Sequence, residues 1–338
     1  MKKQTQYFEE HAEVEMEKGG TFVISLDFEL LWGVFDKVDY TQKKAYFRNT
    51  RNLIPQLLQL FSDYEIHVTW ATVGMLFNEN WKGWTANIPE RIPDYNRREL
   101  SAYHFGHSIS SPTTEELCMA RDLVAQISIT PHQEIATHTY SHYYCLEQGQ
   151  TVETFQKDLE QCIVLAREMD ISLKSLVFPR NQYNEQYLQV CWEMGIENVR
   201  SNPDVWYWSN TMRDAIQDKI FRTGDAYLGL NDKSYTYEDL KWEEGRPLAQ
   251  KASRLLRPHS GNSILDTLKL NRIKSEMLHA AKQQEVYHLW WHPHNFANHP
   301  EENLRELREI LEHYQTCKKT YGFRSRNMVE VNQLVRAV

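Results

Sequence analysis

The sequence has no long apolar segment. In its 338 residues, no segment reaches the ~18 consecutive apolar residues that a membrane-spanning helix needs. Residues 1–20 are charged and have no apolar centre, so they do not resemble a secretory signal. From these two absences we expect a cytoplasmic protein without a membrane span.

Cysteine is sparse, and basic residues are not in excess. The five cysteines are far apart and form no Cys-x-x-Cys pair, which argues against a disulfide framework or a zinc ribbon. A net charge of −8 without a long basic run argues against a nucleic-acid partner. Repeats and low-complexity linkers are absent as well. We therefore expect an N-terminal extension over residues 1–20 and a single domain over residues 21–338.

Short apolar runs alternate with amphipathic segments along the chain. Strands are expected at 22–28, 66–73, 134–138, 175–179, 196–200, 219–223 and 286–292. Helices are expected at 44–63, 113–128, 152–169, 185–194, 263–284 and 301–316. This alternation predicts an α/β fold of parallel strands, either an open sheet or a closed barrel. The irregular stretches 77–112 and 224–262 would form long loops over one end of a barrel.

Ionisable side chains follow four of the expected strands. They are Asp27 and Glu29, His138 and His142, Arg180, and finally His292 and His294. In α/β barrels functional residues collect where the strands end, so we expect these side chains to form one site. Each of them taken alone could also be an ordinary solvated group at a strand end.

The first two pairs have spacings that suit a metal centre. Asp27 and Glu29 are two residues apart, so both carboxylates can lie on one face of a strand. His138 and His142 are four apart, which places two imidazoles on one side of a helical turn. Two histidines and one carboxylate leave open positions for water, which is typical of a catalytic site. The alternative is a pair of surface histidines and a carboxylate that pairs with Arg180.

A metal at this position would support hydrolysis. It would lower the pKa of its bound water from ~15.7 to near 7 and polarise a carbonyl oxygen. The carboxylate that does not bind the metal could take the proton of the water, and His292 could protonate the leaving group. The reaction that these groups predict is the hydrolysis of an amide or an ester.

The order of the motifs resembles that of the polysaccharide deacetylases, a family that includes chitin, peptidoglycan and chitooligosaccharide N-deacetylases. The stretches that carry the resemblance are SLDFELLWG, THTYSH, FPRNQ and LWWH, which lie within residues 21–294. The resemblance implies a distorted seven-stranded (β/α) barrel whose C-terminal face is capped by long loops. It also implies one divalent metal ion, for which we expect zinc, held by an acid and two histidines.

The resemblance assigns roles to the two acids. Glu29 would bind the metal together with His138 and His142, and Asp27 would be the catalytic base. Most members of the family have two adjacent aspartates, whereas Phe28 separates the two acids here. The exchange of roles between Asp27 and Glu29 therefore stays open.

The remaining roles follow from the later motifs. Arg180 would orient the base, although the family pattern Arg-x-Pro is replaced here by a proline that precedes the arginine. His292 would be the proton donor. His294 could contact substrate, and Tyr143 and Trp206 could stack on sugar rings, although aromatic side chains are also common in protein cores. The stretch NPDVWYW, which contains Trp206, is the nearest match to the aspartate–tryptophan motif of the family.

The leading hypothesis is a metal-dependent hydrolase that removes an acetyl group from an N-acetylated sugar of a glycan or a glycan precursor. The sugar would be lipid-linked or nucleotide-linked and would belong to surface polysaccharide biosynthesis. Three alternatives compete with it. They are a metal-dependent hydrolase of a small cyclic amide or ureide, a metal-free glycosidase that uses a pair of carboxylates, and a carbohydrate-binding protein on a decayed barrel.

Overall fold

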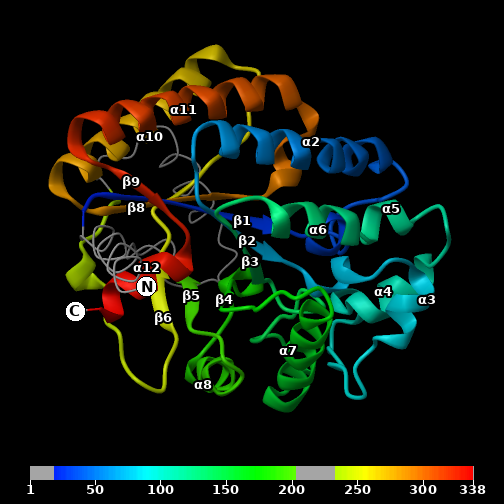
Figure 1. Ribbon diagram of the computed structural model, residues 1–338. Helices are drawn as coiled ribbons and strands as arrows, with labels where there is room; N and C mark the ends of the chain where they lie inside the picture. The colour runs from blue at the N-terminus through cyan, green and yellow to red at the C-terminus, as the bar shows by residue number, and fades with distance from the viewer. Residues whose placement is uncertain (1–18, 203–232, 338) are drawn as a thin grey trace, which may run out of the picture.

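A parallel β-sheet organises the molecule (Figure 1). The computed structural model describes residues 19–202 and 233–337. Within them the strands are β1 (Thr21–Phe28), β2 (Val68–Thr72), β3 (Gln133–Thr137), β4 (Ser175–Leu176), β5 (Asn198–Ser201), β6 (Leu248–Lys251), β7 (Arg254–Leu255), β8 (Val286–Trp291) and β9 (Arg324–Arg326). Each pairing between these strands is parallel. The carboxyl ends of the strands therefore meet at one end of the sheet.

The sheet curls into a distorted barrel. The strand order is β6-β5-β4-β3-β2-β1-β8-β7, and β9 pairs with β1 outside this path. The outermost strands β6 and β7 are neighbours in sequence. Between them, the backbone N–H of Ala252 donates to Ser201 at 2.9 Å, and that of Ser253 donates to His288 at 2.8 Å. The segment between β6 and β7 thus links β5 to β8. The expected distorted barrel of parallel strands is confirmed, although its sheet has nine strands within the described residues instead of the expected seven.

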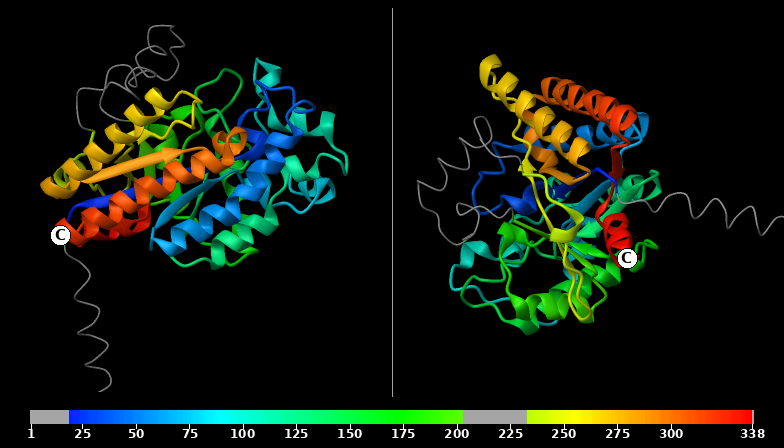
Figure 2. Two further views of the ribbon diagram at one scale, coloured as in Figure 1. Left: turned by 90° about the horizontal axis from the view of Figure 1, so that it is seen from above. Right: turned by 90° about the vertical axis from the view of Figure 1, so that its left-hand side faces the viewer.

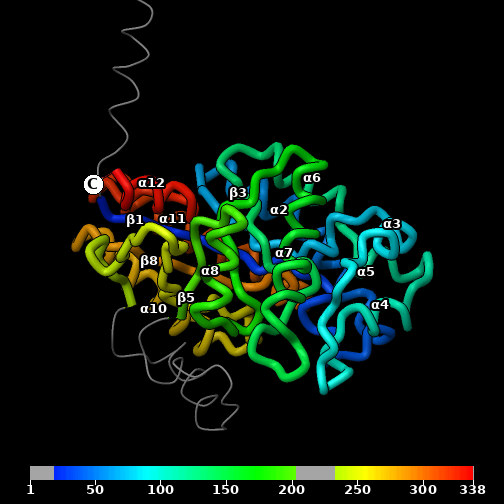
Figure 3. The backbone as a smooth tube through the Cα atoms, turned by 90° about the horizontal axis from the view of Figure 1, so that it is seen from below, coloured from blue at the N-terminus to red at the C-terminus, as the bar shows by residue number. Residues whose placement is uncertain are grey.

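Helices cover the outside of the sheet (Figure 2). The described α-helices are α2 (Lys44–Asp63), α3 (Trp81–Ala86), α4 (Ala102–Ile109), α5 (Glu115–Cys118), α6 (Arg121–Ile129), α7 (Val152–Arg167), α8 (Glu185–Glu193), α10 (Ser263–Gln283), α11 (Pro300–Tyr321) and α12 (Met328–Arg336). Short 3₁₀ turns are η2 (Leu30–Gly33), η3 (Gly74–Phe77), η4 (Arg98–Leu100), η5 (Pro179–Asn181), η7 (Tyr237–Asp239) and η8 (Pro293–Asn298). Figure 3 shows α3, α4 and α5 at the end of the molecule opposite α12.

Local sequence explains several of the helix boundaries. The side chain of Asn184 caps α8 by accepting from the N–H of Gln186. Pro300 lies in the first turn of α11, where its missing N–H costs no hydrogen bond. Among the described residues, no helix combines the length and the apolar character that crossing a membrane requires.

The expected helix 113–128 is divided in two. Its first part is α5 and its second part is α6, with extended backbone at Met119 between them. The N–H of Ala120 donates to Leu76 at 3.0 Å instead of continuing the helix. A tertiary contact with η3 therefore replaces helical hydrogen bonding at this point. The expected strand 219–223 lies outside the described residues.

Candidate metal centre and active site

A pocket of about 460 Å³ opens at the carboxyl ends of the strands. Its walls include the predicted site residues Asp27, Glu29, His138, His142, Arg180, His292 and His294. They follow β1, β3, β4 and β8, so the parallel sheet brings together residues that are far apart in sequence. The expectation that polar groups at these strand ends share one site agrees with this placement.

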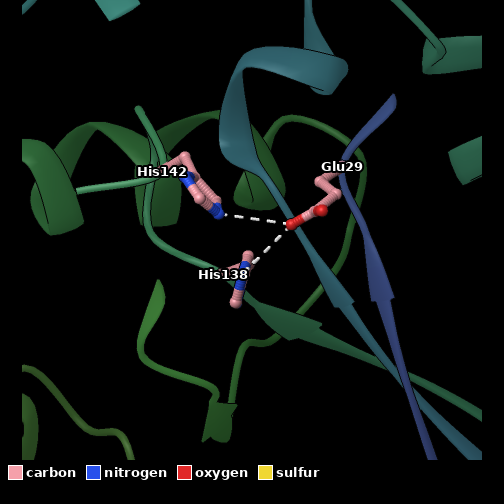
Figure 4. Close-up of side chains that lie close together, drawn as sticks. All are labelled: Glu29, His138 and His142. Atoms are coloured by element: carbon pink, nitrogen blue, oxygen red, sulfur yellow. Dashed lines mark ion pairs between the residues drawn. The ribbon is translucent and has the colours of Figure 1, made fainter. Parts of the chain in front are cut away.

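Glu29 lies against both histidines of the THTYSH motif (Figure 4). Its Oε2 atom is 3.4 Å from Nε2 of His138 and 3.2 Å from Nε2 of His142. All three side chains are buried, and their ligand atoms lie within 4.8 Å of one another. The structure thus places Glu29, rather than Asp27, next to the histidine pair.

The tautomer of His138 makes this cluster suitable for a cation. Nδ1 of His138 is 2.7 Å from the carbonyl oxygen of Val177, which can only accept a hydrogen bond. In the neutral ring, Nε2 therefore carries a lone pair, and this lone pair faces the carboxylate of Glu29. Within the described residues Oε2 of Glu29 has no hydrogen-bond partner. A cation held between the buried oxygen and the nitrogen lone pair would satisfy both.

Burial and neighbouring charges fix the protonation of the cluster. Burial raises the pKa of Glu29, but the surrounding imidazoles, led by His292, outweigh this and hold the pKa well below its usual range. Burial lowers the pKa of His142 to about 4, although Glu29 opposes the shift. Both groups are consequently in their metal-binding forms at neutral pH, with the carboxylate ionised and the imidazole neutral.

The loop that carries His142 is not the helical turn that the spacing predicts. Residues 138–142 form an irregular turn after β3, and both Thr139 and His142 have left-handed backbone, with φ of 62° and 56°. Nδ1 of His142 is 3.1 Å from the hydroxyl of Tyr144, which fixes the ring from behind. The four-residue spacing is therefore compatible with a pair of metal ligands. An irregular turn with left-handed residues brings the two histidines together, and not a helical turn.

Asp27 is held by an arginine that the sequence motifs do not single out. Both of its carboxylate oxygens accept from Arg200, at 2.7 Å each, and the guanidinium also reaches Oγ of Ser25. Arg200 is buried and stacks on Trp290 at 4.2 Å. Burial raises the pKa of Asp27, but Arg200 and the nearby histidines outweigh it, and the pKa lies below its usual value.

Arg180 does not contact Asp27, so its expected role of orienting the base is corrected. It pairs with Asp36 and lies 4.1 Å above the ring of Tyr144. Both oxygens of Asp27 are already bound by Arg200, and Arg180 lies in η5, where it and Asn181 have left-handed backbone. Arg200 could have been found by applying the strand-end rule to the expected strand 196–200, of which it is the last residue.

The two late histidines approach the acids from β8 and η8. Nε2 of His292 is 3.5 Å from Asp27 and 3.8 Å from Glu29, and its side chain is 27% exposed. Nδ1 of His294 is 3.7 Å from Glu29. His294 is buried, and burial lowers its pKa to about 4. His292 is thus the more accessible of the two, whereas His294 is buried beside the carboxylate of Glu29.

The two aromatic residues expected to contact sugar are Tyr143 and Trp206. Tyr143 is fully buried, and its hydroxyl bonds to Gln150, Thr151 and Thr154 at the start of α7. It therefore points away from the pocket, and the expected sugar contact is wrong. Trp206 lies outside the described residues, as does most of the stretch NPDVWYW.

Comparison with known proteins identifies the family of the chain. The family model described as "Polysaccharide deacetylase" matches residues 31–199, half of the chain. The chain belongs to the polysaccharide deacetylase family. The match includes His138 and His142 but begins just after Glu29, so the two acids are placed by the structure. A search of curated proteins finds no significant match.

Solved structures show the same fold as this polysaccharide deacetylase family member. A Mycobacterium smegmatis protein assigned to the polysaccharide deacetylases is 14% identical, with a TM-score of 0.59 over 95% of this chain and 92% of that one. The PuuE allantoinase is 10% identical, with a TM-score of 0.56 over 95% and 92%. A Pseudomonas aeruginosa PAO1 protein, also assigned to the polysaccharide deacetylases, is 9% identical, with a TM-score of 0.54 over 94% of this chain and 91% of that one. At such identities the likeness concerns the fold alone.

Proposed function

We propose that the protein is a metal-dependent N-deacetylase that removes the acetyl group from an N-acetylated sugar of a glycan or a glycan precursor. One observation carries the proposal. Oε2 of Glu29 is buried, lacks a hydrogen-bond partner among the described residues, and faces Nε2 of both His138 and His142. Membership of the polysaccharide deacetylase family supports a hydrolase with a carbohydrate substrate.

Glu29, His138 and His142 would hold the metal in this proposal. Two imidazole nitrogens and one carboxylate are ligands that suit zinc and leave coordination positions open. A divalent cation held there would supply Lewis-acid polarisation of the scissile carbonyl and would acidify water. Val177 and Tyr144 support the ligands, because each contacts the Nδ1 atom of one histidine.

Asp27 would act as the general base. Its two oxygens accept from the fork of Arg200, which keeps the carboxylate ionised and fixes its plane. A carboxylate that is held this way can receive a proton from water without having to reorient. His292 would donate a proton to the departing amine, because it is partly exposed and lies 3.5 Å from Asp27.

The lining of the pocket suits a small acyl group. The candidate ligands are buried, and Phe178, Leu255 and Trp290 add apolar surface to the same pocket. We infer that an acetyl group would be held among these residues. We propose a lipid-linked or nucleotide-linked sugar as the substrate.

A second candidate function keeps the metal and changes the substrate. The acid pair is interrupted by Phe28, and the fold resembles that of the PuuE allantoinase. Both features suit a hydrolase of a small cyclic amide or ureide. A metal-free glycosidase receives less support, because its two carboxylates would have no use for the histidines that surround Glu29.

The deciding experiment measures metal and product together. The purified protein is stripped with a chelator and reloaded with Zn²⁺, and bound metal is then counted by elemental analysis. Acetate release is measured with UDP-N-acetylglucosamine and with chitotetraose, and ring opening is measured with allantoin. Acetate release that depends on the metal supports the deacetylase. Activity on allantoin alone supports the second candidate.

Two variants separate the roles of the acids. Glu29→Gln should lose both metal and activity, because the amide removes the charge between the histidines. Asp27→Asn should keep the metal and lose ~10²–10⁴-fold in rate, the usual contribution of a general base. A wild-type protein that folds but binds no metal would refute both metal-dependent functions.

A further inference from the structure

The loop between His138 and His142 determines where both candidate ligands point. It joins the end of β3 to the segment before α7 and contains two left-handed residues, Thr139 and His142. Non-glycine residues adopt this backbone only at a cost, so surrounding contacts must hold them there. The question is which contacts define the loop.

One side of the loop is held by η3. The N–H of Gly74 donates to the carbonyl of Thr139 at 2.8 Å, and that of Met75 donates to Tyr140 at 2.9 Å. The approach is close, because a Cβ atom on Gly74 would lie 2.8 Å from Cα of Tyr140. Hydrogen bonds from η3 therefore satisfy the carbonyl groups of the loop.

The other side of the loop is held by one carboxylate, that of Asp158 on α7. Its Oδ1 accepts from the N–H of Tyr140 at 2.7 Å and from the N–H of Ser141 at 3.3 Å. Its Oδ2 accepts from the N–H and the hydroxyl of Ser141. Asp158 is buried, with 1% exposure. The two peptide N–H groups that precede His142 thus share a single charged acceptor.

A further contact of Asp158 leads away from the loop. Its Oδ2 also accepts from the hydroxyl of Tyr103 on α4, at 3.0 Å. This bond ties α7 to α4 and involves no residue between His138 and His142. It offers a way to weaken the environment of Asp158 without changing the bonds to the loop.

We propose that Asp158 is a positioning residue for the metal centre, which presents His142 to the metal by binding the backbone of Tyr140 and Ser141. The inference rests on the proposed metal-dependent function, and it adds a residue that no motif of the chain indicates. Without the carboxylate, two buried N–H groups lose their acceptor, and the turn loses the contacts that hold His142 in its left-handed conformation. Outer residues that orient metal ligands commonly change metal affinity by ~10–100-fold when they are replaced.

Asp158→Asn tests the proposal, because it keeps the size of the side chain and replaces one accepting oxygen by a donor. The matched control is Tyr103→Phe, which removes one hydrogen bond from Asp158 on the side away from the loop. Zn²⁺ affinity is measured by competition with a chromogenic chelator. The visible spectrum of the Co²⁺-loaded protein reports ligand geometry independently of activity.

Asp158→Asn should bind Zn²⁺ ~10–100-fold more weakly than the wild type and should change the Co²⁺ spectrum. Tyr103→Phe should stay within ~2-fold of the wild type in affinity even if it lowers thermal stability, because the loop keeps its acceptor. A folded Asp158→Asn variant with wild-type affinity and spectrum would overturn the inference while leaving the proposed function intact. A wild type that binds no metal would overturn the proposed function itself.

Ser141→Ala keeps the inference testable if Asp158→Asn does not fold. It removes the hydroxyl that donates to Oδ2 of Asp158 and leaves the helix unchanged. We expect weaker Zn²⁺ binding in the same direction and of smaller size. Unchanged affinity in Ser141→Ala would then count against a positioning role.

Discussion

Arg200 and Arg180 line the same pocket but neutralise different carboxylates. Arg200 binds both oxygens of Asp27, whereas Arg180 pairs with Asp36. Arg200→Gln removes the positive charge that opposes the effect of burial on Asp27, so the pKa of Asp27 should rise. Because the base must be ionised, the acidic limb of the kcat/KM profile should move to higher pH. The measurement is the pH dependence of kcat/KM on the substrate that the acetate assay identifies.

Arg180→Gln is the matched control for this prediction. It removes a guanidinium from the same pocket but leaves the partner of Asp27 in place, so the acidic limb should not move. Arg200→Gln should also lower the free energy of unfolding by ~3–5 kcal/mol, because it leaves a buried carboxylate unpaired. An acidic limb that stays in place in Arg200→Gln would show that Asp27 is not the base.

Single residues differ in how well the sequence reveals them. The positions of Glu29, His138 and His142 follow from strand ends and spacing, because parallel strands deliver such residues to one edge. The partner of Asp27 does not follow, since Arg200 comes from β5 and pairs with a residue on β1. The strand-end rule would place Arg200 near the site, but no local pattern shows which arginine pairs with Asp27, and the FPRNQ motif points to Arg180 instead.

At the scale of elements, the contact between η3 and the loop from His138 to His142 is unusually tight. A Cβ atom on Gly74 would meet Sγ of Cys162 at 2.7 Å and Cα of Tyr140 at 2.8 Å. Gly74→Ala should therefore push the loop away from η3, lower the free energy of unfolding by ~1–3 kcal/mol and weaken metal binding. Urea unfolding and chelator competition measure the two effects separately.

Gly83→Ala provides the comparison at the same scale. Gly83 lies within α3, and the nearest atom to an added Cβ is Oδ1 of Asn80 at 3.7 Å. Alanine fits there and should stabilise the helix by ~0.5–1 kcal/mol. Metal affinity should stay at the wild-type value. If Gly74→Ala behaved like Gly83→Ala, the closeness of η3 would have no influence on the metal centre.

Helices and strands with a clear apolar pattern can be predicted from the sequence. Short strands that form only through pairing within the barrel cannot. Helices α2, α7 and α8 follow from their apolar stripes, and β1 and β8 from continuous apolar runs. In contrast, β6 and β7 are four and two residues long and have no periodicity of their own. They exist because the edges of β5 and β8 offer unpaired backbone groups on either side of Ala252 and Ser253.

At the scale of the whole molecule, buried histidines set the response to acid. Burial lowers the pKa of His288 to about 3 and those of His142 and His294 to about 4. In the unfolded chain these rings take up protons near pH ~6.5. Their contribution to stability is therefore complete above that pH and is lost as the pH falls toward 4 and, for His288, toward 3.

Asp158 acts in the opposite direction. Burial raises its pKa to about 6, so below that pH the folded state binds a proton that the unfolded chain takes up only near ~3.9. The three histidines favour unfolding in acid, whereas Asp158 favours folding, and the histidines outnumber the single aspartate. Through these groups the free energy of unfolding should fall as the pH decreases from ~6 to ~4.

His288→Gln isolates one of these protons away from the metal ligands. His288 is fully buried in β8, and its Nε2 is 2.8 Å from Oγ of Ser25, a bond that glutamine can replace. In the chelator-treated protein, the free energy of unfolding measured with urea should fall less steeply below pH ~6.5 in His288→Gln than in the wild type, because one group fewer takes up a proton on unfolding. At pH 8 the two proteins should differ only by the changed contact. An unchanged slope would mean that His288 is protonated inside the barrel, where Arg200 lies beside Ser25, and that acid sensitivity arises elsewhere.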